Sequence, residues 1–325
     1  VVPTDLPYEG QKFRLLDDGS ILSESYAPTR TSNTFTGKAT VAKVTGFRID
    51  ALTHPQLPRG GPGRSVLGTG AVSEFQVAVA PIDSPDQKQT IKLVRAVSDV
   101  NPKKTELPMR YRDRDPTQDD RVTGGVNYAI DGDKKTAWST DIGPGRRNQD
   151  RHAIFVPEHP LEISGDVIFS FTLDQSHGGW NSDDNQNYLL GRYRFSITDS
   201  DSIADSTLPS SVESALKVDP QSRTDEENRV LFRHWATTVS EFAEDNERIE
   251  QLWQSFPETD SQLVVRSMGS PRETHVMKRG DFLKHGPAVT PGAPSFLNAM
   301  QETDEAARHR YARLQLADDA PTTAR

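Results

Sequence analysis

The segment Thr45-Gly-Phe-Arg-Ile-Asp-Ala-Leu52 decides the fold class of this chain, together with Val72-Ser-Glu-Phe-Gln-Val-Ala-Val79. In each segment apolar and polar side chains alternate, so that one face of an extended strand is apolar and the other is polar. A glycine- and proline-rich loop, Pro58-Arg-Gly-Gly-Pro-Gly-Arg64, lies between them. We therefore expect two half-buried strands that are joined by a shaped loop.

The same β pattern continues on both sides of these segments, up to about residue 205. Short alternating runs are bounded by Gly, Pro, Asn and Asp, as in an all-β domain. We predict strands at Lys12-Leu16, Ile21-Ser23, Lys43-Leu52, Val72-Ala80, Thr90-Ser98, His152-Val156, Asp166-Asp174 and Leu189-Thr198. Eight strands are enough for two packed sheets, which predicts a jelly-roll-like antiparallel β-sandwich over residues 1–205.

Beyond residue 205 the pattern changes from strand to helix. Ser210 with Glu213, and Thr224 with Glu227, match the capping box that starts many helices. From Thr224 the apolar residues recur every three or four positions, which predicts one long helix ended by Pro257. We predict a helical segment over residues 206–260 and the start of a carboxy-terminal domain, partly extended, over residues 261–325.

Composition excludes several classes of protein. The chain has 325 residues, of which 34% are hydrophobic and 26% are charged, as in a globular protein with a real core. A formal net charge of -9 argues against a nucleic-acid partner, because such proteins carry basic surfaces that neutralise phosphates. No apolar run is long enough to span a bilayer. The first residues resemble neither a signal peptide nor a start with methionine, so we expect an excerpt of a longer protein.

Several blocks of the chain resemble the planctomycete-type cytochrome c domain-containing proteins. They are Asp17-Asp-Gly-Ser-Ile-Leu22, Leu57-Pro-Arg-Gly-Gly-Pro-Gly-Arg64, Val72-Ser-Glu-Phe-Gln-Val77, Leu189-Leu-Gly-Arg-Tyr-Arg-Phe-Ser-Ile-Thr198 and Arg272-Glu-Thr-His-Val-Met-Lys-Arg-Gly-Asp-Phe282. The resemblance implies a middle β-sandwich of an exported, periplasmic or extracellular protein. The chain has no cysteine and therefore no Cys-x-x-Cys-His haem motif, so the resemblance implies that any haem domain lies elsewhere.

The segment Ala129-Ile-Asp-Gly-Asp-Lys-Lys-Thr-Ala-Trp-Ser139 resembles the Asp-Gly and Thr-x-Trp signature of discoidin-like and other galactose-binding-like sandwiches. Many of these bind sugars, and some hold a structural calcium ion. The resemblance implies Asp131, Asp133 and Thr136 as calcium ligands, with Glu74 as a fourth. Hard oxygen ligands suit calcium. The alternative is a plain Asp-Gly-Asp turn without a metal ion.

Two tryptophans are candidates for stacking on a sugar ring, because an indole offers a flat apolar face. Trp180 lies in a loop with Asn181 and Asn185, whose amides could bond to hydroxyl groups, whereas Trp138 follows the Asp-Gly segment. The alternatives are that Trp138 fills the core and that Trp180 caps a hairpin. Arg64 is a candidate for an acidic group of a ligand, or for an ion pair that holds its own loop.

The leading hypothesis is a non-catalytic module that binds a polysaccharide, with calcium as a possible structural ion. The second is a structural spacer or docking domain for neighbouring domains of the same protein. The third is part of a hydrolase or redox enzyme whose active residues lie elsewhere. The acid pairs Asp119-Asp120 and Asp183-Asp184 are available for hydrolysis, but no pattern holds them at the distance that glycosidases require.

Overall fold

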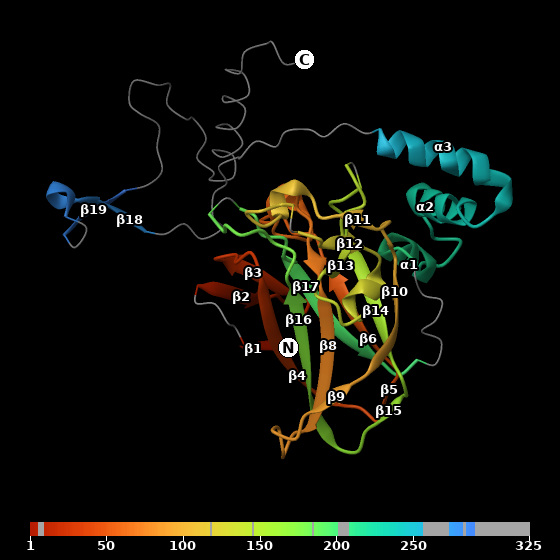
Figure 1. The fold of residues 1–325 in the computed structure, drawn as a ribbon, viewed down its shortest axis with the longest axis horizontal. Helices are drawn as coiled ribbons and strands as arrows, with labels where there is room; N and C mark the ends of the chain where they lie inside the picture. Colours follow the sequence, from red (N-terminus) through yellow and green to blue (C-terminus); the bar gives the residue numbers. More distant parts are fainter. Residues whose placement is uncertain are drawn as a thin grey trace, which may run out of the picture. The chain divides into compact units, whose positions relative to one another are not determined.

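The computed structural model describes residues 1–5, 10–117, 119–144, 146–183, 185–200, 208–255, 273–281 and 284–289. It separates into two compact units, Val1–Thr259 and Asp260–Arg325. The first unit is mainly β with antiparallel sheets and a short helical segment, which confirms the predicted fold class (Figure 1). The sandwich and the helices, which the sequence suggested as separate segments, both belong to this unit. The predicted tail beyond residue 289 lies outside the described residues.

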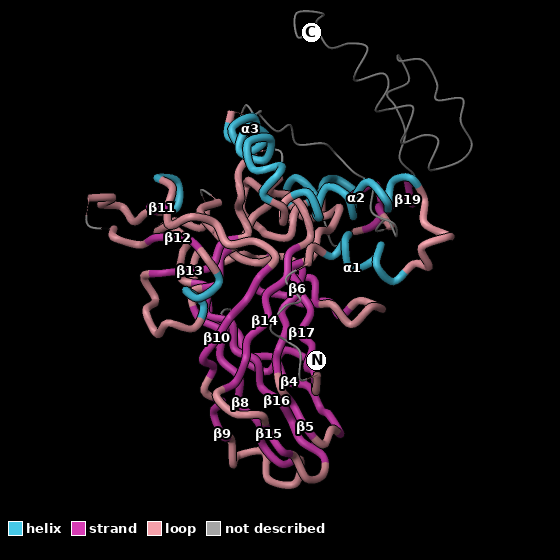
Figure 2. Tube along the Cα trace, turned by 90° about the vertical axis from the view of Figure 1, so that its right-hand side faces the viewer, coloured by secondary structure: helices cyan, strands magenta, loops and turns pink. Residues whose placement is uncertain are grey.

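Two large sheets form the sandwich (Figure 2). One has the order β1-β4-β16-β8-β9, with bounds Val2–Asp5, Thr31–Thr40, Asp166–Gln175, Glu74–Pro81 and Gln89–Ile91. The other has the order β10-β14-β6-β17-β3-β2, with bounds Leu93–Ser98, Arg151–Pro157, Gly46–Ala51, Arg192–Thr198, Ile21–Ser25 and Gln11–Leu15. Within both sheets every neighbouring pair is antiparallel.

Smaller elements complete the first unit. A third sheet has the order β11-β12-β13-β7, with bounds Thr105–Glu106, Val122–Gly124, Thr136–Ser139 and Ala71–Val72. Strand β15 (Leu161–Glu162) pairs with β5 (Lys43–Val44). In Figures 1 and 2, β11–β13 and the helices lie at the end of the sandwich opposite to β5, β9 and β15. The third sheet and the helices therefore shape the same end of the sandwich.

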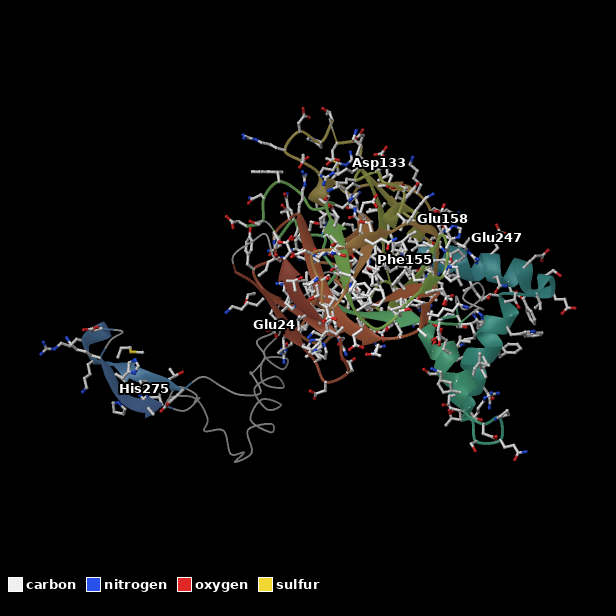
Figure 3. All side chains as sticks on the ribbon, turned by 90° about the horizontal axis from the view of Figure 1, so that it is seen from below. Glu24, Asp133, Phe155, Glu158, Glu247 and His275 are labelled. Carbon is white, nitrogen blue, oxygen red and sulfur yellow. The ribbon has the colours of Figure 1, made fainter. Side chains whose placement is uncertain are left out.

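Aromatic rings from the two large sheets meet in the core. Phe171 of β16 stacks on Phe195 of β17 with ring centres 4.9 Å apart, and Phe75 of β8 lies 4.6 Å from Phe155 of β14. Figure 3 shows Phe155 inside the sandwich. Each such pair contributes about 0.5–1.5 kcal/mol beyond the burial of its area. The alternation that predicted these strands is thus what turns their rings toward each other.

Strands form at all eight predicted places, but three of the predictions merged two strands. Lys43-Leu52 covers β5 and β6, Val72-Ala80 covers parts of β7 and β8, and Thr90-Ser98 covers β9 and β10, which belong to different large sheets.

Several strands were missed, of which β4 is the longest. Its sequence, Thr31-Ser-Asn-Thr-Phe-Thr-Gly-Lys-Ala-Thr40, is mostly polar, yet all ten residues pair with β16. The inward face is Thr31, Asn33 and Phe35, and the Thr31 hydroxyl donates a 2.8 Å hydrogen bond to Asn33. Because these polar groups satisfy each other, they can be buried in a central strand.

The prediction of one long helix from Thr224 is wrong. Helix α2 (Asp225–Ala236) ends before a separate helix α3 (Ala243–Gln254), with a 3₁₀ turn at Ser240–Phe242 between them. The hydroxyls of Thr237 and Thr238 donate to the carbonyls of His234 and Trp235. These side-chain bonds and the extended backbone of Val239 end the first helix.

The predicted capping boxes differ in outcome. Thr224 and Glu227 form both reciprocal hydrogen bonds at the start of α2, as predicted. Helix α1 (Ser210–Lys217) starts at the other predicted place, but its N-cap is Pro209 and has no side-chain bond. Glu213 lies 3.6 Å from Arg48 of β6, and this ion pair joins α1 to the sandwich.

In the second unit the described residues form a hairpin of β18 (Thr274–Met277) and β19 (His285–Val289). The ring of His275 bonds through Nδ1 to the carbonyl of Gly286 at 3.0 Å, so this histidine supports the hairpin. No helix among the described residues has both the length and the apolar surface that a bilayer crossing needs.

Candidate functional site

Glu74 and the Asp131–Thr136 turn meet at one place in the structure. Glu74 begins β8 and pairs across the sheet with Asp174 of β16. Both side chains are buried, and the Glu74 residue is only 6% exposed. The backbone amide of Gly132 hydrogen-bonds to the Glu74 carboxylate. Glu74 therefore contacts the turn that the sequence placed beside it, although the two are far apart along the chain.

The turn itself is closed by its own hydrogen bonds. Asp131 accepts the amide of Asp133 on Oδ1 at 2.9 Å and the hydroxyl of Thr136 on Oδ2 at 2.8 Å. Gly132 has a φ of +79°, a conformation that favours glycine. Asp133 is exposed at the edge of the molecule (Figure 3), and its Oδ1 accepts the amide of Lys135. Within the described ranges, no group of three or more His, Cys, Asp or Glu residues is arranged to hold a metal ion.

The charges around Glu74 are poorly compensated. Burial raises the pKa of Glu74, as do the nearby carboxylates of Asp131 and Asp174, whereas the Gly132 amide and Lys134 lower it. The Lys134 ammonium lies 2.5 Å from Asp174, and this hydrogen bond raises the pKa of Lys134. Glu74 Oε1 has no hydrogen-bond partner among the described residues. The single ammonium of Lys134 thus lies near two buried carboxylates, those of Asp174 and Glu74, and the Oε1 acceptor of Glu74 receives no hydrogen bond from the described residues.

The predicted acid pair Asp119-Asp120 is engaged with basic side chains. Asp119 pairs with Arg121 at 2.5 Å, and Asp120 pairs with Lys135 at 2.7 Å. Arg121 also donates to the carbonyls of Ser176, Gly178 and Tyr111, which ties its loop to the sandwich. The loop before Arg121 therefore has a structural anchor. Asp184 lies outside the described residues.

Trp180 is exposed on a well-bonded loop. Its side chain is 55% exposed, and the guanidinium carbon of Arg114 lies 5.8 Å from its ring centre. The loop is held by the Asn181 amide, which donates to Gln186 Oε1 at 3.1 Å, and by Asn181 Oδ1, which accepts the Asp183 amide. Asn185 adopts a φ of +53°, which asparagine tolerates better than most residues. Trp180, Asn181 and Asn185 therefore lie on one turn, as their sequence spacing predicted.

A second exposed aromatic ring lies beside this loop. The Tyr26 hydroxyl is 3.4 Å from the hydroxyl of Ser182, and the Tyr26 ring is also exposed. Arg30 donates to the carbonyl of Gly178 at the base of the loop. We call the surface formed by Tyr26, Trp180, Asn181, Asp183 and Asn185 the Trp180 rim.

Trp138 and Arg64 are engaged in contacts within the protein rather than presented to a ligand. Trp138 is completely buried in β13, so its indole has no exposed face on which a sugar could stack. This burial matches the alternative that it fills the core. Arg64 donates to the hydroxyl of Ser23 at 3.1 Å and to the carbonyl of Ser25 at 2.6 Å. Its guanidinium therefore holds the glycine-proline loop against β3.

A cleft that the sequence did not indicate lies between the third sheet and α3. Its volume is about 530 Å³, within the range of about 300–1,000 Å³ that is usual for ligand pockets. Its lining is formed by residues 100–103, Thr105, Pro108, Thr123, Ser139, residues 141–143, Arg146, Tyr188, Glu250 and Gln254. These segments are distant in sequence and share no motif, so only the fold brings them together. We call this cavity the α3 cleft.

Comparison with models of protein families, with curated proteins and with solved structures finds no match to this chain. The geometry of the Trp180 rim, of the Glu74 cluster and of the α3 cleft is therefore the basis for assigning a function.

Proposed function

We propose that the sandwich is a non-catalytic module that binds polysaccharide through the Trp180 rim, in an exported multidomain protein. The exposure of Trp180 carries this proposal. Removing the surface of a large aromatic ring from water is favourable. The half-exposed indole of Trp180 would therefore gain binding free energy when an apolar sugar face covers it. Tyr26 offers a second ring close to the same loop.

The polar groups of the rim suit a hydroxylated ligand. Asn181, Asp183 and Asn185 follow Trp180 directly and add carboxamide and carboxylate groups next to the ring. Arg114 covers part of the indole and supports it by a cation–π contact. The rings thus supply the apolar contact and their neighbours supply hydrogen bonds, which are the two components of sugar recognition.

The proposal includes a calcium ion beside Glu74. The unpartnered Oε1 of Glu74, with the carboxylates of Asp131 and Asp174 nearby, supports a cation at this position. Thr136 and Asp133 would then act through the turn, since Thr136 already bonds to Asp131 and Asp133 is exposed. Calcium would support the turn and would take no part in contacts to the sugar.

Retention of the chain on insoluble polysaccharides, with calcium and with chelator, tests the proposal. Trp180→Ala should abolish retention, because it removes the exposed ring. Trp235→Ala is the matched control, because Trp235 of α2 is similarly exposed at 48% but lies outside the rim. Equal retention of the parent and Trp180→Ala, or no retention of the parent on any polysaccharide, would contradict it. Loss of retention with chelator alone would assign calcium a supporting role.

A second candidate function is docking to a neighbouring domain, and one observation favours it. Phe232 and Trp235 of α2 are exposed, and both rings lie within 6.1 Å of Phe242. Three touching rings on an acidic helical segment form an apolar patch of the kind found at interfaces. Docking predicts the opposite pattern of variants: Trp235→Ala weakens association with adjoining parts of the full-length protein, and Trp180→Ala leaves it unchanged.

A further inference from the structure

We propose that the α3 cleft is a second binding site, and that its ligand is a short neutral oligosaccharide. The site shares no residue with the Trp180 rim, so it holds whether or not the rim binds polysaccharide. Its lining, its charge balance and the way in which α3 closes it support this assignment.

The lining of the cleft is rich in groups that both donate and accept hydrogen bonds. Ser139 and Tyr188 form a buried hydroxyl pair with their oxygens 2.8 Å apart, and Thr105 and Thr123 form a second pair at 3.1 Å. Asp141 accepts hydrogen bonds from the Gly143 amide and from Arg147 Nε, both on its Oδ1. Hydroxyls and a carboxylate that line one cavity match a ligand with many hydroxyl groups.

Apolar surface lies between these polar groups. Val100, Pro102, Pro108 and Ile142 also line the cleft. A sugar ring has apolar C–H faces and a polar edge, so it can cover both kinds of surface. A wholly apolar ligand would remove water from the hydroxyl pairs and from Asp141 without replacing their hydrogen bonds, which is unfavourable.

The charges of the cleft favour a neutral ligand over an anion. Arg146 forms a two-pronged ion pair with Glu250, with distances of 2.9 and 3.0 Å. Asp141 faces the same cavity and adds a negative charge, and Lys103 adds a positive one. Recognition of phosphate or sulfate depends on an excess of basic groups. This cavity has no such excess, because two basic residues in its lining, Lys103 and Arg146, are matched by two acidic ones, Asp141 and Glu250.

Helix α3 forms one wall of the cleft and contacts the sandwich beside it. The Arg146–Glu250 pair joins the helix to the loop after β13, and Trp253 stacks on the Arg146 guanidinium at 5.4 Å. Glu250 and Gln254, one turn apart on α3, both line the cavity. A ligand in the cleft would therefore contact the sandwich and α3 together and strengthen their association.

Isothermal titration calorimetry with cellotriose, maltotriose, xylotriose and inorganic phosphate as probes tests this site. Gln254→Trp should fill the cleft and weaken trisaccharide binding by about tenfold or more. Gln251→Trp is the matched control, because it places the same ring on α3 outside the cleft lining. Asp141→Asn keeps an oxygen that can accept the bonds of Gly143 and Arg147, and it should weaken binding as well.

The outcomes separate this site from the rim. Saturable binding of a trisaccharide that survives Trp180→Ala and Gln251→Trp but is lost in Gln254→Trp supports the proposal, provided that thermal unfolding midpoints stay within about 2 °C. No binding of any trisaccharide up to about 10 mM overturns it. Binding that depends on Trp180 and not on the cleft variants also overturns it, as does phosphate binding that exceeds all trisaccharide binding.

Discussion

Asp119 and Glu74 are both buried carboxylates of the sandwich unit, and their surroundings are opposite. The Asp119 side chain is 1% exposed, and its two oxygens accept four hydrogen bonds, from the Arg121 side chain and from the amides of Arg121 and Asp113. The Arg121 side-chain hydrogen bond lowers the pKa of Asp119. Glu74 has one amide and two acidic neighbours, and its pKa is raised.

The difference separates a structural carboxylate from a candidate site. A buried carboxylate that is fully hydrogen-bonded to a cationic partner stabilises the fold that surrounds it. A buried carboxylate with an unfilled acceptor costs free energy until a proton or a cation satisfies it. Four variants test this contrast, in order of decreasing effect.

Arg121→Ala should have the largest effect. It leaves Asp119 buried without its cation and removes three bonds to backbone carbonyls, so the free energy of unfolding should fall by about 3–5 kcal/mol. Urea unfolding measures it. The matched control is Arg14→Ala, whose exposed pair with Glu24 should contribute about 1 kcal/mol or less. Equal losses for the two variants would refute the distinction.

Glu74→Gln should stabilise the protein at neutral pH by about 1–2 kcal/mol, because it keeps the shape and removes a poorly compensated buried charge. The pH dependence gives a second test. The folded pKa of Glu74 lies above its ordinary 4.5, so its stabilising contribution is present below pH 4.5 and is lost as pH rises through the folded value.

The pKa of Asp119 is lowered from 3.8, so the stability that it contributes is present above pH 3.8 and is lost as pH falls below it. Urea titrations from acid to neutral pH should show two losses of stability in the parent. The loss on raising the pH, which is due to Glu74, should disappear in Glu74→Gln, and the loss on lowering the pH, which is due to Asp119, should remain. If the free energy of unfolding depends on pH in the same way in the parent and in Glu74→Gln, the raised pKa of Glu74 is contradicted.

Lys134→Met should lower the free energy of unfolding by about 1 kcal/mol or less, because the Lys134 side chain is largely exposed and its pair with Asp174 is screened by water. Removal of this ammonium leaves two buried carboxylates without a cation. Added calcium should therefore raise the thermal midpoint of Lys134→Met more than that of the parent. An identical response of both proteins to calcium would argue against a cation beside Glu74.

Asp133→Ala should have the smallest effect, about 0.5 kcal/mol or less, because this carboxylate is exposed and its hydrogen bond is to the amide of the nearby Lys135. The calcium response should also persist, since the contacts of Asp131 with Thr136 and of Gly132 with Glu74 are untouched. A calcium response that disappears in this variant would instead make Asp133 a direct ligand.

Local pattern predicted much of this molecule, and its failures have definite causes. Phe47, Ile49, Phe171 and Phe195 alternate with polar neighbours, and they do form the core. Strand β4 was missed because polar residues were buried by pairing among themselves, which no hydrophobic period reveals. The break before α3 was missed because an apolar stripe continues through it, although hydroxyl groups end the helix there.

The candidate sites divide in the same way. The sequence by itself determined the alternating core strands, the position of Trp180 and Asn181 on one loop and the closure of the Asp131 turn, because each depends on neighbours along the chain. The tertiary structure alone decided that Trp138 is buried, that Arg64 is bonded to β3, that Glu74 Oε1 has no hydrogen-bond partner among the described residues and that α3 closes a cleft. These properties depend on which distant groups become neighbours, and only packing sets the burial and the charge that each group then meets.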